Sequence, residues 1–140
     1  MEKLAAMRVR PLLLIFCSLA IAACDRRYKE VDHPFYLMFI EDPREVALFR
    51  CPNEPGIGCA IDGLPGRYVV AAGADKRFVV VAQRSDPDVS GPTRYYYFAR
   101  VPQETSGWGN NPERIIGPLD EQEFAAARAK LQLPDFTVQP

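Results

Sequence analysis

One seven-residue segment, Arg77–Gln83 with the sequence RFVVVAQ, limits the fold more than any other part of the chain. Successive side chains of a β-strand point to opposite faces of the sheet. Phe78 and Val80 then share one face. Val79 and Val81 share the other face, so both faces are apolar. Such a strand buries its side chains only in the middle of a sheet that is covered on both sides.

Other apolar runs, rich in aromatic and β-branched residues, are separated by clusters of proline and glycine, which is the signature of strands. Together they predict five strands: Phe35–Ile40, Val46–Cys51, Arg67–Ala72, Arg77–Gln83 and Arg94–Val101. The turn segments 41–44 and 73–76 have lengths that favour antiparallel hairpins. We therefore expect most of the sheet to be antiparallel.

One helix is expected near the C-terminus. Asp120 and Glu123 have the spacing of a capping box, in which each side chain bonds the backbone N–H of the other residue. Phe124, Ala127 and Leu131 follow at the spacing of one helix face and form a stripe that can pack on the sheet. Pro134 prevents the helix from continuing.

These elements predict an α+β fold, with an antiparallel sheet of about five strands and a C-terminal helix packed on it. Residues 34–140 are expected to form this single globular domain. Residues 24–33 consist of Cys24 followed by DRRYKEVDH, a polar stretch without periodicity, and we interpret them as a tether.

The first 23 residues have the composition of an export signal. Lys3, Arg8 and Arg10 precede the twelve residues Leu12–Ala23, which are apolar apart from one serine. A membrane-spanning helix needs roughly 20 apolar residues, so this segment is too short to be a permanent anchor. We interpret residues 1–23 as a cleaved signal peptide.

The end of this segment, Ile21-Ala22-Ala23-Cys24, resembles the lipobox of bacterial lipoproteins. The resemblance implies that Cys24 is alkylated by diacylglycerol, that cleavage makes it the first residue, and that its amine is often acylated. The acyl chains of these lipid groups would anchor the protein to a membrane. Asp25 implies retention at the periplasmic face of the inner membrane, with the outer membrane as the alternative. Ordinary secretory cleavage near Ala23 is the other interpretation.

The composition argues against nucleic-acid binding. The chain has 140 residues, with 17 Lys and Arg, 18 Asp and Glu, and a net charge of −1. Loss of the basic signal segment makes the remaining chain more acidic. Binding to nucleic acid calls for a basic surface and a recognisable motif, and the sequence has neither.

Cys51 and Cys59 flank a segment of turn-forming residues, PNEPGIG. Because exported proteins meet an oxidising compartment, we expect the two to form a structural disulfide. Free or reactive thiols are the alternative. Metal binding would call for more cysteine or histidine nearby, and redox catalysis usually shows a Cys-x-x-Cys spacing.

No combination of residues predicts catalysis, a metal site or a cofactor. His33 is the only histidine of the chain. Glu41 and Asp42 are adjacent and would point to opposite faces of a strand. Asp86 and Asp88 alone provide too few oxygen ligands for calcium. We therefore predict a protein that is not an enzyme, with no catalytic residues.

Two aromatic residues are candidates for partner binding. Trp108 lies in the turn-rich segment Thr105–Pro112, and Trp and Tyr are favoured anchors of protein interfaces. Tyr96 belongs to a strand with tyrosine on both faces. The alternative for Trp108 is that it packs on the edge of the core.

The segment 66–131 is similar in outline to small exported bacterial proteins, many of them lipoproteins, to which no activity is assigned. The similarity rests on Ala74-Asp75-Lys76-Arg77-Phe78, Tyr95-Tyr96-Tyr97 and Ile116-Gly117-Pro118-Leu119. It implies a fold and no catalytic residues. We therefore expect a non-catalytic binding or accessory module that meets a protein partner in the envelope. The alternative is an inhibitor of a cell-wall or other extracellular hydrolase, with the Cys51–Cys59 loop as the inhibitory element.

Overall fold

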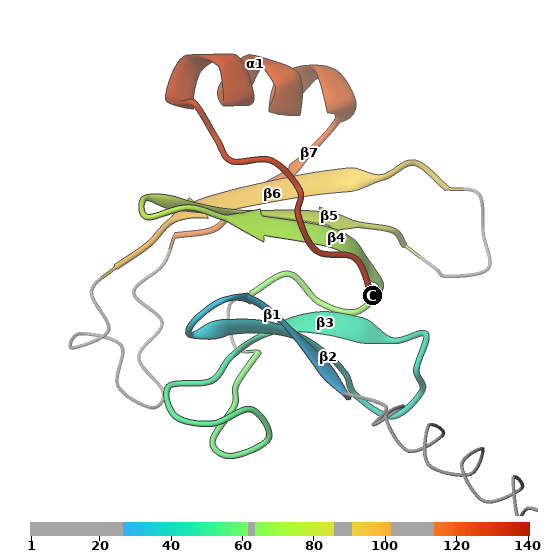
Figure 1. Cartoon of the computed structure of the whole chain (residues 1–140). Coiled ribbons are helices and arrows are strands. Elements are labelled where there is room, and N and C mark those ends of the chain that lie inside the picture. The colour runs from blue at the N-terminus through green and yellow to red at the C-terminus, as the bar shows by residue number, and fades with distance from the viewer. Residues whose placement is uncertain (1–26, 62–63, 86–90, 102–113) are drawn as a thin grey trace, which may run out of the picture.

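The computed structural model describes residues 27–61, 64–85, 91–101 and 114–140, which form three layers (Figure 1). The first layer is a three-stranded sheet, the second a four-stranded sheet, and the third a helix. The elements are β1 (Tyr28–Asp32), β2 (Phe35–Phe39), β3 (Val46–Arg50), β4 (Val69–Ala74), β5 (Phe78–Gln83), β6 (Arg94–Ala99), β7 (Ile116–Leu119) and α1 (Glu121–Leu131). Strands follow sequence order within each sheet, β1-β2-β3 and β4-β5-β6-β7, and all pairs are antiparallel.

The main core lies between the two sheets. Val79 and Val81 of β5, both fully buried, face this layer together with Phe98 of β6. From the other sheet, Phe35 sets its ring 5.4 Å from that of Phe98 in an edge-to-face arrangement. Most other members of this core are aliphatic side chains of β2, β3 and β4.

A second core lies between the four-stranded sheet and α1. Val80 of β5 packs with Phe124 of the helix and Leu133 beyond it. The Tyr95 ring stacks on Phe124 at 4.7 Å between centroids. The prediction that β5 is central and covered on both sides is thus confirmed.

The helix begins as predicted. The Asp120 side chain accepts a hydrogen bond from the Glu123 backbone N–H, and the Glu123 side chain accepts one from the Asp120 N–H, which completes the capping box. Phe124 is buried, and Ala127 and Leu131 are partly buried against the second core. The predicted stripe therefore does pack on the sheet.

The α+β class is confirmed, but the prediction of a single five-stranded sheet is wrong. After β3 the chain passes to another layer, where β4 begins at Val69, and β4 does not pair with β3. The backbone of β3 instead exchanges hydrogen bonds with Ala60, at 2.9 Å in both directions. A second sheet, rather than a helix, covers the Val79 and Val81 face because β1 to β3 expose an apolar face of their own.

The predicted tether extends too far along the chain. Tyr28–Asp32 form β1, an edge strand paired with β2. Val31 packs against the main core, whereas the other four residues of this strand are exposed. A strand with one inward side chain has almost no apolar periodicity, so its sequence did not predict a strand. β7 was missed for a similar reason, since its Gly117 and Pro118 are typical of turns and edge strands.

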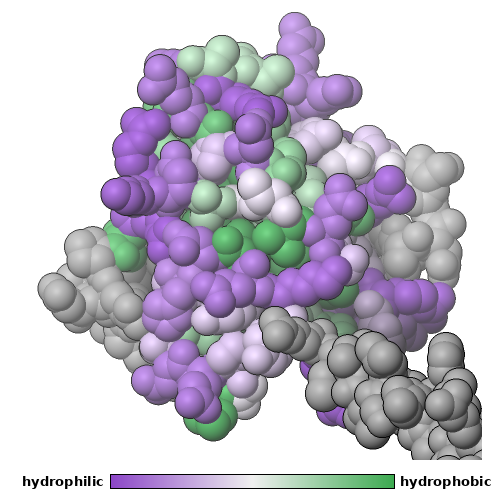
Figure 2. Space-filling view, viewed as in Figure 1, coloured by the Kyte–Doolittle hydropathy of each residue, from purple (hydrophilic) through white to green (hydrophobic). Residues whose placement is uncertain are grey.

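The C-terminal segment covers the outer edge of β4. The Ala72 N–H donates to Val138 O at 2.9 Å, and Ala72 O accepts from the Thr137 and Val138 N–H groups, each at 3.0 Å. Figure 2 shows this side of the molecule, where apolar side chains in the middle are surrounded by hydrophilic ones. Among the described residues, no helix is long and apolar enough to cross a membrane.

Candidate functional site

A depression of about 370 Å³ lies where β4 begins, β5 ends and β6 begins. Its walls include Arg67, Tyr68, Gln83, Arg84, Arg94 and Tyr96. We call it the arginine–tyrosine depression. It contains Tyr96, one of the two residues predicted to bind a partner. Trp108, the other, lies outside the described residues.

The wall formed by residues 67 and 68 is attached to the end of β5. The Gln83 side-chain amide donates to Arg67 O at 2.7 Å, and the Arg84 N–H donates to Tyr68 O at 3.0 Å. Tyr68 has a φ of 69°, a left-handed conformation that costs about 1 to 3 kcal/mol for a residue with a side chain. Such strain persists where the surrounding structure holds the backbone in place, as these hydrogen bonds do here.

Tyr96 lies between the core and the depression. It is partly buried against the main core, and its ring also lies against β7. An ideal Cβ at Gly117, whose φ is 138°, would come within 2.6 Å of Tyr96 Cδ1. Glycine at position 117 therefore gives the Tyr96 ring its place in the wall.

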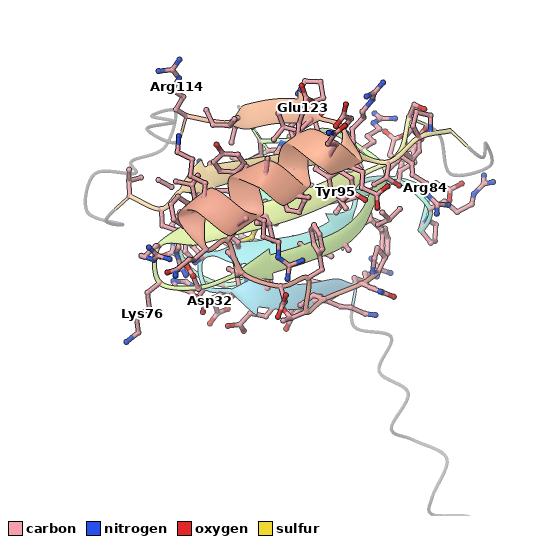
Figure 3. The ribbon with its side chains drawn as sticks, turned by 90° about the horizontal axis from the view of Figure 1, so that it is seen from above. Asp32, Lys76, Arg84, Tyr95, Arg114 and Glu123 are labelled. Carbon is pink, nitrogen blue, oxygen red and sulfur yellow. A yellow bond between two sulfur atoms is a disulfide. The ribbon has the colours of Figure 1, made fainter. Side chains whose placement is uncertain are left out.

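Three arginines surround this depression, and only one of them has an acidic partner among the described residues. Arg67 Nη1 lies 3.0 Å from Glu45 Oε2. Arg84 and Arg94 are exposed and form no ion pair within the part of the chain that the structure describes. Figure 3 places Arg84 at the end of the molecule opposite Asp32 and Lys76.

These three arginines are far apart in the sequence, and no local pattern predicts that they lie together. They lie in three segments, before β4, after β5 and at the start of β6. The signal that was available is the β5–β6 pairing: Gln83 is opposite Arg94, so Arg84 and Arg94 flank one connection. The position of Arg67 depends on the β4–β5 register and on the turn at Tyr68.

The disulfide between Cys51 and Cys59 is present, as predicted. Cys51 is fully buried next to β3, whereas the loop that the disulfide closes extends into solvent. Its turn is held by a hydrogen bond from the Ile57 N–H to Glu54 O at 3.1 Å. The Ile57 side chain lies within this loop and is 62% exposed, an unusually high exposure for a large apolar side chain.

A groove of about 290 Å³ adjoins the beginning of β1. Its apolar lining includes Leu37 and Phe39 of β2, Val46 of β3 and Pro140 near the C-terminus. Arg27 and Lys29 lie at this groove as well, and Lys29 Nζ donates to Gln139 O at 3.0 Å.

The polar cluster at the other end of the sandwich holds the two sheets together. Arg100 forms an ion pair with Asp32, and it donates to His33 O at 2.7 Å and to Asp75 O at 2.8 Å. The pKa of the Asp75 carboxyl is lowered. Burial acts to raise this pKa, but hydrogen bonds from the Phe78 and Arg77 N–H groups, together with the charges of Arg77 and Arg100, outweigh the effect of burial. Among the described residues, no group of three or more His, Cys, Asp or Glu side chains is placed to hold a metal ion.

No protein-family model matches this chain, and neither the curated proteins nor the solved structures include a significant match.

Proposed function

We propose that this protein is a lipid-anchored, non-catalytic binding module of the bacterial envelope, and that it meets its partner at the arginine–tyrosine depression. The observation that carries the proposal is the segment Ile21–Cys24, which directly follows an apolar stretch of signal-peptide length. The depression supports binding because it combines a concave surface, aromatic walls and cationic side chains. We place the protein at the periplasmic face of the inner membrane because Asp25 follows Cys24.

The fold supports a position close to the bilayer. Since β1 begins at Tyr28, only a few residues separate the sheet from Cys24. At roughly 3.3 Å per residue, this connection spans at most about 13 Å. The groove beside Arg27 and Lys29 would then lie near the lipid headgroups, where each cation contributes about 1 kcal/mol of attraction to anionic lipid.

The anchor is tested by mass and by fractionation. The intact mass of the membrane-extracted protein should correspond to a chain that begins with diacylglyceryl-modified Cys24. A Cys24→Ser variant should leave the membrane fraction, whereas the matched Cys17→Ser variant, altered within the signal, should remain there. An unmodified N-terminus in the membrane-extracted protein would end the proposal. Separation of inner from outer membranes on a density gradient tests the role of Asp25.

The binding surface is tested by crosslinking in intact cells. Tyr96→Ala, which also removes a ring packed against the main core, and Trp108→Ala should remain folded and lose the crosslinked envelope partner. Tyr28→Ala is the matched control, because Tyr28 is 38% exposed and lies outside the depression. If both variants capture the same partner at the same yield as the unaltered protein, the proposed surface is wrong.

One observation favours a second candidate function, inhibition of an extracellular hydrolase. The exposed Ile57 at the end of the disulfide-closed loop is an apolar group on a rigid support, which suits insertion into a cleft. The protein in excess should then inhibit lysozyme or another cell-wall hydrolase, and Ile57→Asp should abolish the inhibition. Full activity across a panel of such enzymes would remove this candidate.

A further inference from the structure

We propose that the arginine–tyrosine depression binds an oxyanion, a phosphate or carboxylate group, carried on an apolar body. This inference deepens the proposed function, since it names the ligand class of the same surface. It does not depend on the lipid anchor.

The charge of the depression carries the inference. Its guanidinium groups come from Arg67, Arg84 and Arg94, and none of the described residues that line it is acidic. Like charges that are gathered on one surface repel one another. Within the part of the chain that the structure describes, a carboxylate, that of Glu45, pairs with Arg67 but with neither Arg84 nor Arg94. An anion between the arginines would remove the remaining repulsion. Guanidinium is also the side chain whose paired N–H donors match the two oxygens of a phosphate or carboxylate.

The shape of the depression indicates what the anion is attached to. The rings of Tyr68 and Tyr96, with Pro118, add an apolar wall beside the guanidinium groups. An isolated inorganic ion would leave this wall unused. A ligand with an apolar or aromatic body would cover the wall and place its charged group among the arginines.

The backbone of the depression is already in position. Hydrogen bonds from Gln83 and from the Arg84 N–H hold the backbone of Arg67 and Tyr68 against the end of β5. The β5–β6 register holds Arg94 opposite Gln83. Binding therefore orders mainly the arginine side chains, which limits its entropic cost.

The test is a calorimetric titration of the full protein, in uncharged detergent at constant ionic strength, with phenyl phosphate as the probe. Phenyl phosphate should bind, and neutral phenyl glucoside should bind at least tenfold more weakly. Arg84→Gln and Arg94→Gln should each weaken phenyl phosphate binding about tenfold, the loss expected for one charge-assisted hydrogen bond. Arg114→Gln is the matched control: it removes the same charge from an exposed arginine far from Arg84 (Figure 3) and should leave the affinity unchanged.

A further variant predicts a gain rather than a loss. Glu45→Gln removes the carboxylate that neutralises Arg67, so phenyl phosphate should bind a few times more tightly. Weaker or unchanged binding would count against a role for Arg67. The inference as a whole is overturned if the Arg84→Gln, Arg94→Gln double variant binds phenyl phosphate like the unaltered protein, or if phenyl glucoside binds equally well.

Competition against bound phenyl phosphate distinguishes the two sources of the oxyanion, a lipid headgroup and a soluble molecule. Micelles doped with phosphatidylglycerol, but not with phosphatidylcholine, should displace phenyl phosphate if the natural ligand is a lipid headgroup. Glycerol 3-phosphate and benzoate report on a soluble phosphate or carboxylate, and displacement by either, without an effect of phosphatidylglycerol, assigns a soluble ligand. The mass and fractionation of the protein report on the anchor separately, so each proposal can fail without the other.

Discussion

Substitution of Gly73 by alanine should release the C-terminal segment from the edge of β4. A Cβ at this position would lie 2.9 Å from the Asp135 carbonyl carbon, 3.2 Å from Phe136 Cα and closer still to Asp135 O. These atoms are backbone, so no side-chain rotation can relieve the overlap. Either the segment around Asp135 moves away or β4 is deformed.

The magnitude follows from the contacts that this movement breaks. Three backbone hydrogen bonds join Ala72 to Thr137 and Val138, and a hydrogen bond contributes about 1 kcal/mol on average. Phe136 would lose its ring contacts with Tyr95 and Phe124, about 0.5 to 1.5 kcal/mol. Replacing glycine by alanine within a strand by itself stabilises the folded state by about 0.5 to 1 kcal/mol, which offsets part of this loss. The free energy of unfolding should therefore fall by about 2.5 to 4 kcal/mol.

Two measurements check this value. Urea denaturation should give the loss of stability, and hydrogen exchange should show that the Ala72 amide loses its protection. Gly66→Ala is the matched control, because its new Cβ would meet only Gln83 Nε2 at an ordinary 3.6 Å. If Gly73→Ala unfolds at the same urea concentration as the unaltered protein and Ala72 stays protected, the reasoning about this contact is refuted.

Replacing Cys51 and Cys59 together by alanine should lower the free energy of unfolding by about 2.5 kcal/mol, because a crosslink over a sequence separation of 8 restricts the unfolded chain; equal urea midpoints would contradict this. Asp120→Ala should cost about 1 kcal/mol and reduce helical circular dichroism, whereas Asp120→Asn keeps an acceptor and should cost less. The pKa of Asp42 is lowered from 3.8 to about 2 by hydrogen bonds from the Arg44 side chain and N–H. The contribution of this ion pair to folding stability is present above pH 3.8 and is lost as the pH falls through about 2. NMR of the Asp42 carboxyl should show the low pKa, and Arg44→Gln should return this pKa towards 3.8.

Local patterns in the sequence predicted the elements that bury a clear apolar face. The alternating pattern of β5 predicted a central strand with two covered faces, and the spacing of Asp120 and Glu123 predicted the beginning of the helix. The hairpin between β4 and β5 was predicted too, although β4 begins two residues later than expected, at Val69. In each case the physical signal lies within a few neighbouring residues.

The missed elements lack such a signal. β1 turns only Val31 inwards, and β7 contains glycine and proline, so both depend on pairing with a neighbour that is already in place. The separation into two sheets has the same origin. The apolar pattern of β5 predicts that both of its faces are buried. It does not predict whether a helix or another sheet covers each face.

Residues close together in the chain were sufficient to predict the Cys51–Cys59 disulfide, the periods of the main strands and of the helix, and the α+β class. The division into two sheets and the position of Arg67, Arg84 and Arg94 around Tyr96 became visible only in the folded chain. The reason is that strand register and the turn at Tyr68 set those distances. A functional surface made of exposed side chains has no periodicity of its own and takes its geometry from the core beneath it.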